Sequence, residues 1–267
     1  MSQKKSGSSL QGMLAAIVIP AAYILCLIIY KVVLGSPANF QGNNPELDPL
    51  PGNYLGMVYK GGFVVPILMS LLVIVVTFVV ERFITVNKSK GKGSIDAFVH
   101  NMRSALSKND VEGALKECDR QQGSIAAVVK SGLNAYKQMA TEKELDKEHK
   151  IAAIQKEIEE ATTLELPMLS KNLIIISTIA SIATLMGLFG TVLGMIRAFG
   201  ALAQAGAPDA SALATGISEA LINTGLGIGT SAIAIIFYNF FTNKIDSITY
   251  GIDEAGYSIV QSFTARH

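Results

Sequence analysis

The sequence has few charged residues, little cysteine and histidine, and no tryptophan. Only 16% of its 267 residues are Asp, Glu, Lys or Arg, whereas 50% are hydrophobic, which is too apolar for an ordinary soluble domain. The formal net charge is +1, and no basic run is interleaved with aromatic residues, so no nucleic-acid partner is expected. Part of this chain is therefore expected to lie in an apolar environment rather than in water.

The cysteines and histidines give no sign of a disulfide or a metal site. Cys26 falls in an apolar run and Cys118 in a polar segment, which argues against a bridge, and neither has metal-ligand spacing. The polar stretches contain no catalytic triad, phosphate loop or dinucleotide fingerprint. We therefore expect a protein that is not an enzyme and holds no cofactor. The histidines lie in polar stretches and are read as solvated: His100, His149 and His267.

Long apolar runs are abundant instead. Four segments are each long enough to cross a bilayer, which takes about 20 helical residues because each residue rises only about 1.5 Å. Only the fourth contains an acidic residue, Glu219. The predicted fold is all-α: a multi-pass membrane protein with four transmembrane helices and a helical cytoplasmic domain. The predicted spans are residues 13–34, 61–80, 172–196 and 213–243.

The first apolar run has an alternative interpretation as a cleaved signal peptide, because Lys4 and Lys5 precede it. The apolar core of a signal peptide covers about 7 to 15 residues, whereas residues 13–30 are unbroken and no clear small-residue cleavage site follows. We therefore expect a retained helix, with Tyr30 and Lys31 as anchors at the membrane interface.

Lysine positions predict the orientation, because positive residues beside spans stay in the cytoplasm. The connections 35–60 and 199–212 nearly lack positive charge. Both termini and the segment 85–171 are therefore expected in the cytoplasm, with two loops outside. The flanking cations are Lys4, Lys5, Lys88, Lys90, Lys92, Lys171 and Lys244.

The polar segments differ in pattern. Residues 39–53 are dense in Pro, Gly and Asn and should be irregular. In 85–171, apolar residues recur at helical spacing, with Ser94 and Asp110 as expected N-caps. Pro167 should kink or interrupt the helix that leads to the third span.

The third and fourth spans contain as much Gly, Ala, Ser and Thr as large aliphatic residues, so they should pack on protein. Gly190 and Gly194 form one pair of small residues four apart, and Gly225 and Gly229 form another, each permitting two helices to approach closely. Together with Gly187, these glycines are the predicted helix-packing residues.

Polar side chains form a stripe on each of these two spans. On the third, residues 177, 184, 191 and 198 recur every seven positions, with a drift of only about 20° per step. On the fourth, the polar set falls within an arc of about 140°. Such stripes indicate a wet cavity or a polar partner helix, although a single Ser or Thr often bonds the carbonyl four residues back. The members are Ser177, Thr184, Thr191 and Ala198, and Glu219, Asn223, Thr224, Gly227, Thr230 and Ser231.

Glu219 requires its own explanation, because an ionised carboxylate in hydrocarbon costs about 2.5 to 3.5 kcal/mol on insertion scales. It needs a partner or a proton. Three alternatives remain open: solvation at the nearby interface, a pair with Arg197 at similar depth on the third span, or an Arg197 that snorkels outward instead.

These same residues carry a resemblance to a known family. Residues 183–199, AlaThrLeuMetGlyLeuPheGlyThrValLeuGlyMetIleArgAlaPhe, resemble the third-span signature of the ExbB, TolQ and MotA proton-channel family. Residues 217–229, IleSerGluAlaLeuIleAsnThrGlyLeuGlyIleGly, continuing to Tyr238 and Asn239, are similar to the fourth-span signature of the ExbB and TolQ branch. The likeness covers roughly residues 61–246, including GluArgPhe at 81–83, and is greatest to ExbB.

The resemblance implies a motor subunit of the bacterial inner membrane. With an ExbD-like single-span partner, it would use inward proton flow to drive a TonB-like energy transducer for outer-membrane transport. It also implies a homo-oligomer, expected to be a pentamer, around a pore that holds two partner helices. By motif position, Thr191, Thr224 and Glu219 would line the route of the proton carried by the partner's aspartate.

Two departures from the family pattern stand out. The family commonly has proline where Thr184 stands, so Thr184 enters the expected ion pathway only through its place on the stripe. The family has three spans, so the first helix and its outer loop are extra. The predicted parts are residues 1–60, the extra helix and periplasmic loop; 61–84, the second span; 85–171, the cytoplasmic domain; 172–243, the pore-lining third and fourth spans; and 244–267, a cytoplasmic helix.

Two other functions remain open. A sodium-driven, flagellar, gliding or TolQ-type motor is possible, because Asn223 and the hydroxyls could help coordinate a cation. A passive scaffold is the alternative from another class, with helices that only assemble other membrane proteins.

Overall fold

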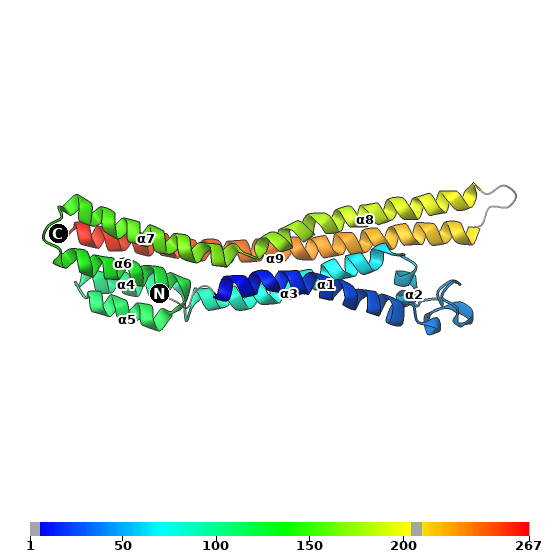
Figure 1. Ribbon diagram of the computed structural model, residues 1–267, viewed down its shortest axis with the longest axis horizontal. Helices are drawn as coiled ribbons and strands as arrows, with labels where there is room; N and C mark the ends of the chain where they lie inside the picture. The colour runs from blue at the N-terminus through cyan, green and yellow to red at the C-terminus, as the bar shows by residue number, and fades with distance from the viewer. Residues whose placement is uncertain (1–5, 204–209, 267) are drawn as a thin grey trace. The chain divides into compact units, whose positions relative to one another are not determined.

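The computed structural model describes residues 6–203 and 210–266 of the chain (Figure 1). Its described elements are helical, apart from one isolated bridge between Phe40 and Pro49. The nine α-helices of the described ranges are α1 (Ser6–Ile29), α2 (Tyr54–Tyr59), α3 (Val64–Lys90), α4 (Ile95–Ser107), α5 (Val111–Gln121), α6 (Gly123–Thr141), α7 (Lys147–Ser170), α8 (Leu173–Leu202) and α9 (Ala210–Thr264). A π-helical turn, Tyr30–Leu34, and two 3-10 turns, Pro37–Asn39 and Gln41–Asn43, lie between α1 and α2.

The all-α membrane fold predicted from the sequence is confirmed. Four helical segments of the described chain are long and apolar enough to cross a membrane, and they begin in α1, α3, the α7 to α8 stretch and α9. Two of the helices extend well beyond the predicted spans. The fourth, α9, runs unbroken for 55 residues, so residues 244–264 continue the helix of the fourth span.

The chain divides into two compact units. The apolar unit comprises the residues up to Val79 together with Ile175–Phe237, and the polar unit comprises Val80–Ile174 together with the chain from Tyr238 onward. Each unit has its own buried core.

In the apolar unit, the segment between α1 and α3 is held by asparagine side chains. Asn39 donates its amide to the carbonyls of Val33 and Leu34, at 2.8 and 3.0 Å. Asn53 donates to Oδ1 of Asn39 at 3.1 Å and accepts the backbone N–H of Gly56, which caps α2. The stretch expected to be irregular therefore contains 3-10 turns fixed by these bonds, and only its second half lacks helical turns before α2.

The polar unit is a helical bundle in which α4 packs on α5, α5 on α6, and α6 on α7 (Figure 1). The apolar positions picked out by helical spacing are buried, as Phe98, Met102 and Ile154 show. Ser94 occupies the N-cap position of α4 without a side-chain bond, whereas Asp110 caps α5 by accepting the N–H of Gly113 at 2.7 Å.

The end of α9 completes the core of the polar unit. Its apolar residues are buried beside those of α4, α6 and α7, and Tyr136 packs edge-to-face on Phe263. Close contacts require glycine here, because a Cβ on Gly251 would lie 2.5 Å from a methyl group of Ile95. The residues that α9 buries are Ile248, Ile252, Ala255, Ile259 and Phe263.

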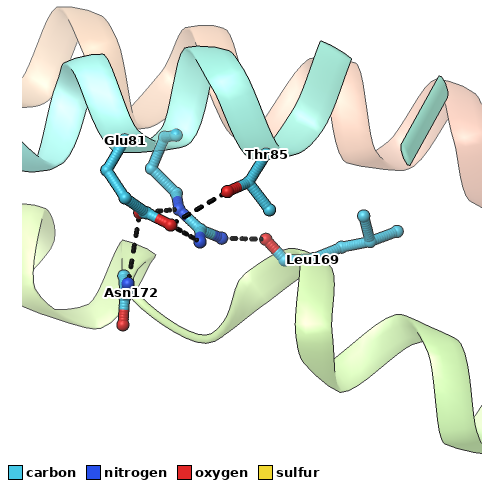
Figure 2. Close-up of polar contacts among 5 residues, drawn as sticks. Glu81, Thr85, Leu169 and Asn172 are labelled. Carbon is cyan, nitrogen blue, oxygen red and sulfur yellow. Dashed lines mark hydrogen bonds and ion pairs between the residues drawn. The ribbon is translucent and has the colours of Figure 1, made fainter. Parts of the chain in front are cut away.

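A buried arginine forms hydrogen bonds where α7 ends and α8 begins, and Figure 2 shows the polar contacts at this point. Arg82 is 1% exposed; it pairs with Glu81 at 2.6 Å and donates to the carbonyl of Leu169 at 2.9 Å. Asn172 and Thr85 donate to the same Glu81 carboxylate, at 3.1 and 2.9 Å. The guanidinium therefore satisfies one of the carbonyls that every helix end leaves without a partner.

Pro167 does not end the helix at its own position. Helix α7 continues over it to Ser170, and the interruption falls at Lys171 and Asn172. Proline lacks an N–H and crowds the carbonyl of the preceding turn. The break lies one turn later, where Arg82 accommodates the freed carbonyl of Leu169.

Candidate ion pathway

Helices α8 and α9 lie side by side in the apolar unit and run antiparallel (Figure 1). A Cβ on Gly187 would lie 2.9 Å from the carbonyl oxygen of Asn223, and one on Gly194 would lie 2.7 Å from that of Gly216. Backbone that close excludes side chains, so these positions need glycine. Of the predicted packing residues, Gly187, Gly190 and Gly194 all lie in this contact.

The other two predicted packing glycines point elsewhere. A Cβ added to Gly225 or Gly229 would meet no atom of the described chain within 4 Å. Within the described residues this pair contacts no other helix, and Gly216 and Gly227 are the glycines of α9 that lie against α8. Spacing shows that a helix has a small-residue face, but it does not show which face meets a neighbour.

The hydroxyls of Thr191 and Thr224 are in direct contact across the two helices. The Thr191 hydroxyl also lies 3.1 Å from the carbonyl oxygen of Gly187, within its own helix, and 3.4 Å from that of Ala220 on α9. Both threonines are half-buried. The two stripes derived from the sequence therefore meet at this pair.

Thr184 does not join this pair. It is exposed, two turns before Thr191, and its side-chain hydroxyl makes no hydrogen bond within the described residues. Other polar residues of the fourth-span arc are structural: Ser231 donates to the carbonyl of Ala180 at 2.6 Å and so ties α9 to α8.

Glu219 pairs with Arg197, one of the alternatives left open by the sequence. One guanidinium nitrogen of Arg197 lies 2.6 and 2.7 Å from the two oxygens of the Glu219 carboxylate. Glu219 is only 2% exposed, whereas the side chain of Arg197 is 53% exposed. The carboxylate is thus buried against its partner, and the arginine reaches it from an open position.

A glycine pair that sequence reasoning missed covers the Glu219 carboxylate. Gly62 has a φ of +76°, and a Cβ there would lie 2.5 Å from Oε1 of Glu219. Only glycine combines this backbone conformation with such a close approach. The consecutive glycines at 61 and 62, just before an apolar run, were the available signal.

Asn223 connects this glycine pair to α9. It is completely buried and donates its amide to the carbonyl of Gly61 at 2.8 Å. Its other side-chain atom, Oδ1, is buried without a hydrogen-bond partner in the described part of the chain. Gly190 makes room for the amide, because a Cβ there would lie 2.6 Å from Cγ of Asn223.

The arrangement can therefore bind or relay a small cation or a proton. It offers two touching hydroxyls, a paired carboxylate and a buried amide oxygen, all on or between two closely packed apolar helices. In the described ranges, no three His, Cys, Asp or Glu side chains gather as a metal site would need.

Fold and site together define a multi-pass, all-α membrane protein with polar side chains along a close helix pair. The model of the MotA/TolQ/ExbB proton channel family matches residues 120–254, just over half of the chain. The chain belongs to this family.

Curated relatives of the chain bear ExbB and TolQ names. It is 38% identical over 86 residues to the putative biopolymer transport protein ExbB-like 3 of Synechocystis sp., covering 32% of this chain and 41% of that protein. It is 26% identical over 164 residues to the Tol-Pal system protein TolQ of Pseudomonas aeruginosa, covering 59% and 68%. It is 38% identical over 72 residues to the biopolymer transport protein ExbB of Salmonella typhimurium, covering 27% and 30%. The chain thus spans less than half the length of the two ExbB-named relatives.

Proposed function

We propose that this chain is an ExbB-like subunit of a proton-driven motor in the bacterial inner membrane. With an ExbD-like single-span partner, it energises a TonB-like transducer for outer-membrane transport. The observation that carries the proposal is the contact between the Thr191 and Thr224 hydroxyls, because it brings the two polar stripes together at one depth of the α8 and α9 pair.

The chemistry of the site suits proton passage. A hydroxyl can donate to a carboxylate or accept from a carboxylic acid, so it can solvate either form without holding it. A carboxyl group on a partner helix could therefore load and release its proton beside Thr191 and Thr224. Glu219, about one turn further along α9 toward Ala210, adds negative charge beside the route.

Lysine positions support the proposed orientation. Lys88 and Lys90 end α3, and Lys244 follows the apolar part of α9. Positive residues flanking spans stay in the cytoplasm, which assigns both termini and the polar unit to that side. The turns between α1 and α3, and the connection between α8 and α9, then face the periplasm.

Exposed apolar and small residues support assembly with other helices and with lipid. Leu185, Leu188 and Ile196 of α8 are exposed in the single chain, as are Leu221 and Ile236 of α9. The open face of Gly225 and Gly229 would let another helix approach α9 closely. These faces fit a ring of copies, expected to be five, around the partner's helices.

Proton flux into vesicles tests this proposal. The chain would be purified with its ExbD-like partner, reconstituted, and driven by a potassium diffusion potential, with an internal pH dye as the readout. We expect the double variant Thr191→Val and Thr224→Val to lose most of the flux. Thr77→Val is the matched control, because its hydroxyl only bonds the carbonyl of Val73 within α3. Absence of flux from the unaltered complex would instead favour a passive scaffold.

A sodium-driven motor is the second candidate, and Asn223 is the observation that favours it. Its Oδ1 is buried without a hydrogen-bond partner among the described residues, and a neutral amide oxygen is a ligand that hard cations accept. Flux measured in sodium-free buffer separates the two ions. A sodium-driven complex would be silent there, whereas a proton-driven complex would keep its rate.

A further inference from the structure

The apolar unit contains a cavity of about 570 Å³ directly beside the Glu219 to Arg197 pair. Three parts of the chain line it: the segment between α1 and α3, the end of α8 and the start of α9. We call it the Glu219 cavity. Its charged lining residues are Glu46, Asp48, Lys60, Arg197 and Glu219.

Specific bonds hold the wall contributed by the N-terminal segment. Lys60 donates to the carbonyl of Glu46 at 2.9 Å. Tyr30 and Tyr59 stack with ring centroids 4.7 Å apart, and the Tyr30 hydroxyl donates to the carbonyl of Tyr59 at 2.9 Å. Both tyrosines line the cavity. Hydrogen bonds and ring stacking therefore hold Tyr30, Tyr59 and Lys60 in place along this side of the cavity.

Glu219 is itself one of the residues that line the cavity. Gly62 closes over one side of Glu219, and the bond from Asn223 to the Gly61 carbonyl holds that turn in place. Arg197 and Glu219 both line the cavity, and Nη1 of Arg197 bonds both carboxylate oxygens. The ion pair therefore borders the cavity directly.

The charge of the lining fits a cation. Three carboxylates and two cationic side chains give a small negative excess, and low-dielectric walls strengthen the field of such a set. Charged side chains lining a narrow entrance are a common basis of ion selectivity. The same negative excess disfavours an anion in the cavity.

We propose that the Glu219 cavity is the vestibule through which a small hydrated cation, hydronium or Na⁺, reaches Glu219 from the outer side. The segment from Tyr30 to Gly62 then has a defined task, which is to build half of this vestibule. The inference rests on the proposed function and its orientation.

Thiol modification tests the vestibule in the reconstituted complex with the ExbD-like partner. Cys26 and Cys118 are buried and would be replaced by Ala, so that introduced cysteines are the sole targets. Thr215→Cys places a thiol in the cavity lining, and Tyr54→Cys is the matched control, because Tyr54 is 78% exposed and lies outside the lining. A membrane-impermeant, positively charged methanethiosulfonate would be added from the outer side.

We expect modification at position 215 to lower cation flux about tenfold, because it adds a fixed positive charge within several ångströms of the route. Modification at position 54 should leave the flux unchanged. Complete labelling at 215 without loss of flux would overturn the vestibule, and so would equal losses at both positions. A cysteine-free complex that carries no flux before labelling would instead contradict the proposed function itself.

A charge reversal gives a second, independent test. Glu46→Lys should lower flux at low ionic strength and lose most of this effect in high salt, because salt screens exposed charges. Glu144→Lys in the polar unit is the control, since Glu144 is an exposed acidic residue far along the chain. A flux that Glu46→Lys leaves unaltered at low salt would contradict a cation-attracting vestibule.

Discussion

The side-chain amide of Asn223 donates a hydrogen bond of 2.8 Å to the backbone carbonyl of Gly61, a residue 162 positions earlier in the chain. The bond fixes the turn before α3 against α9, and the neighbouring Gly62 covers the Glu219 carboxylate. One amide group therefore links the N-terminal segment to the part of the chain with the family signatures.

Replacing Asn223 tests that link. Asn223→Leu removes the side-chain amide that donates to the buried Gly61 carbonyl, and a buried carbonyl without a partner costs about 1 to 3 kcal/mol. We expect a fall of that size in unfolding free energy, measured by thermal or denaturant unfolding of the detergent-solubilised chain. Asn239→Leu, at an exposed position of the same helix, should change little. Equal stability of both variants would contradict the role of the bond.

Glycine substitutions separate the two faces of the helix pair. Gly190→Ala would push a methyl group to 2.5 Å from Cβ of Asn223, and overpacking of this kind costs about 1 to 3 kcal/mol. Gly225→Ala meets no neighbour within the described chain and should gain up to about 1 kcal/mol from helix propensity. Unfolding of the isolated chain in detergent measures both effects. A loss of unfolding free energy for Gly225→Ala as large as for Gly190→Ala would contradict the assignment of Gly190, and not Gly225, to the contact between α8 and α9.

A double-mutant cycle measures the coupling of Arg197 and Glu219. Each single change, Arg197→Gln or Glu219→Gln, leaves the other group without its ionic partner, so the double variant should lose less stability than the sum of the two. We expect a coupling of about 1 kcal/mol, near the lower end of the usual range, because the Arg197 side chain is 53% exposed. Additive losses would show that the pair is not coupled.

The junction of α7 and α8 depends on Arg82. Arg82→Met leaves the Glu81 carboxylate and the Leu169 carbonyl short of a donor, and breaking a buried pair in this way costs about 3 kcal/mol. Arg103→Met is the control, because its pair with Glu254 is solvent-exposed and worth at most about 1 kcal/mol. Arg82→Lys should rescue only part of the loss, since one ammonium group cannot reproduce the two-sided contact. Denaturant unfolding compares the three.

Lowering the pH should weaken the N-cap that Asp146 provides at the start of α7. The backbone N–H of His149 donates to this carboxylate at 2.9 Å and holds the pKa of Asp146 below its ordinary value of 3.8. A group whose pKa is lowered by folding contributes stability above its unfolded pKa and loses it as the pH falls through the folded value. The cap is therefore complete at neutral pH and is lost below about pH 4.

Asp146→Asn provides the comparison, because asparagine also caps helices but does not titrate. Fraying at the start of α7, followed by NMR chemical shifts of residues 147–151, should depend more strongly on pH between 5 and about 2 in the unaltered chain than in the variant. Identical profiles would show that Asp146 does not control this end of the helix.

The fold was predictable from the sequence to the level of its helices. An apolar run long enough to cross a bilayer identifies a membrane-spanning helix with few other signals. The seven-residue recurrence of the third span placed Thr191 on the face that meets Thr224. The roles of Thr191, Thr224, Glu219, Asn223 and Thr184 in ion passage stay predictions, and Thr184 lies apart from the pair.

Contacts between distant segments were not predictable in the same way. Gly62 and Glu219 are brought together by a turn whose conformation has no periodic signature, and only the positive φ of Gly62 reveals why glycine stands there. In the structure Glu219 is both paired with Arg197 and approached by Gly62. Likewise, the spacing of Gly225 and Gly229 matched a packing motif, but the rotation of α9 about its axis turned that face away from α8.

The turn at Gly61 and Gly62 also bears on how such a protein could be shortened. Removing residues 1–60 would leave Gly61 and Gly62 in the chain, but it would take away the carbonyls of Val58 and Tyr59, to which their backbone N–H groups donate at 3.0 and 3.2 Å. A shortened chain would therefore need another way to hold the turn that contacts Glu219 and Asn223. The extra N-terminal segment thus supports the backbone turn on which the surroundings of two buried polar side chains depend.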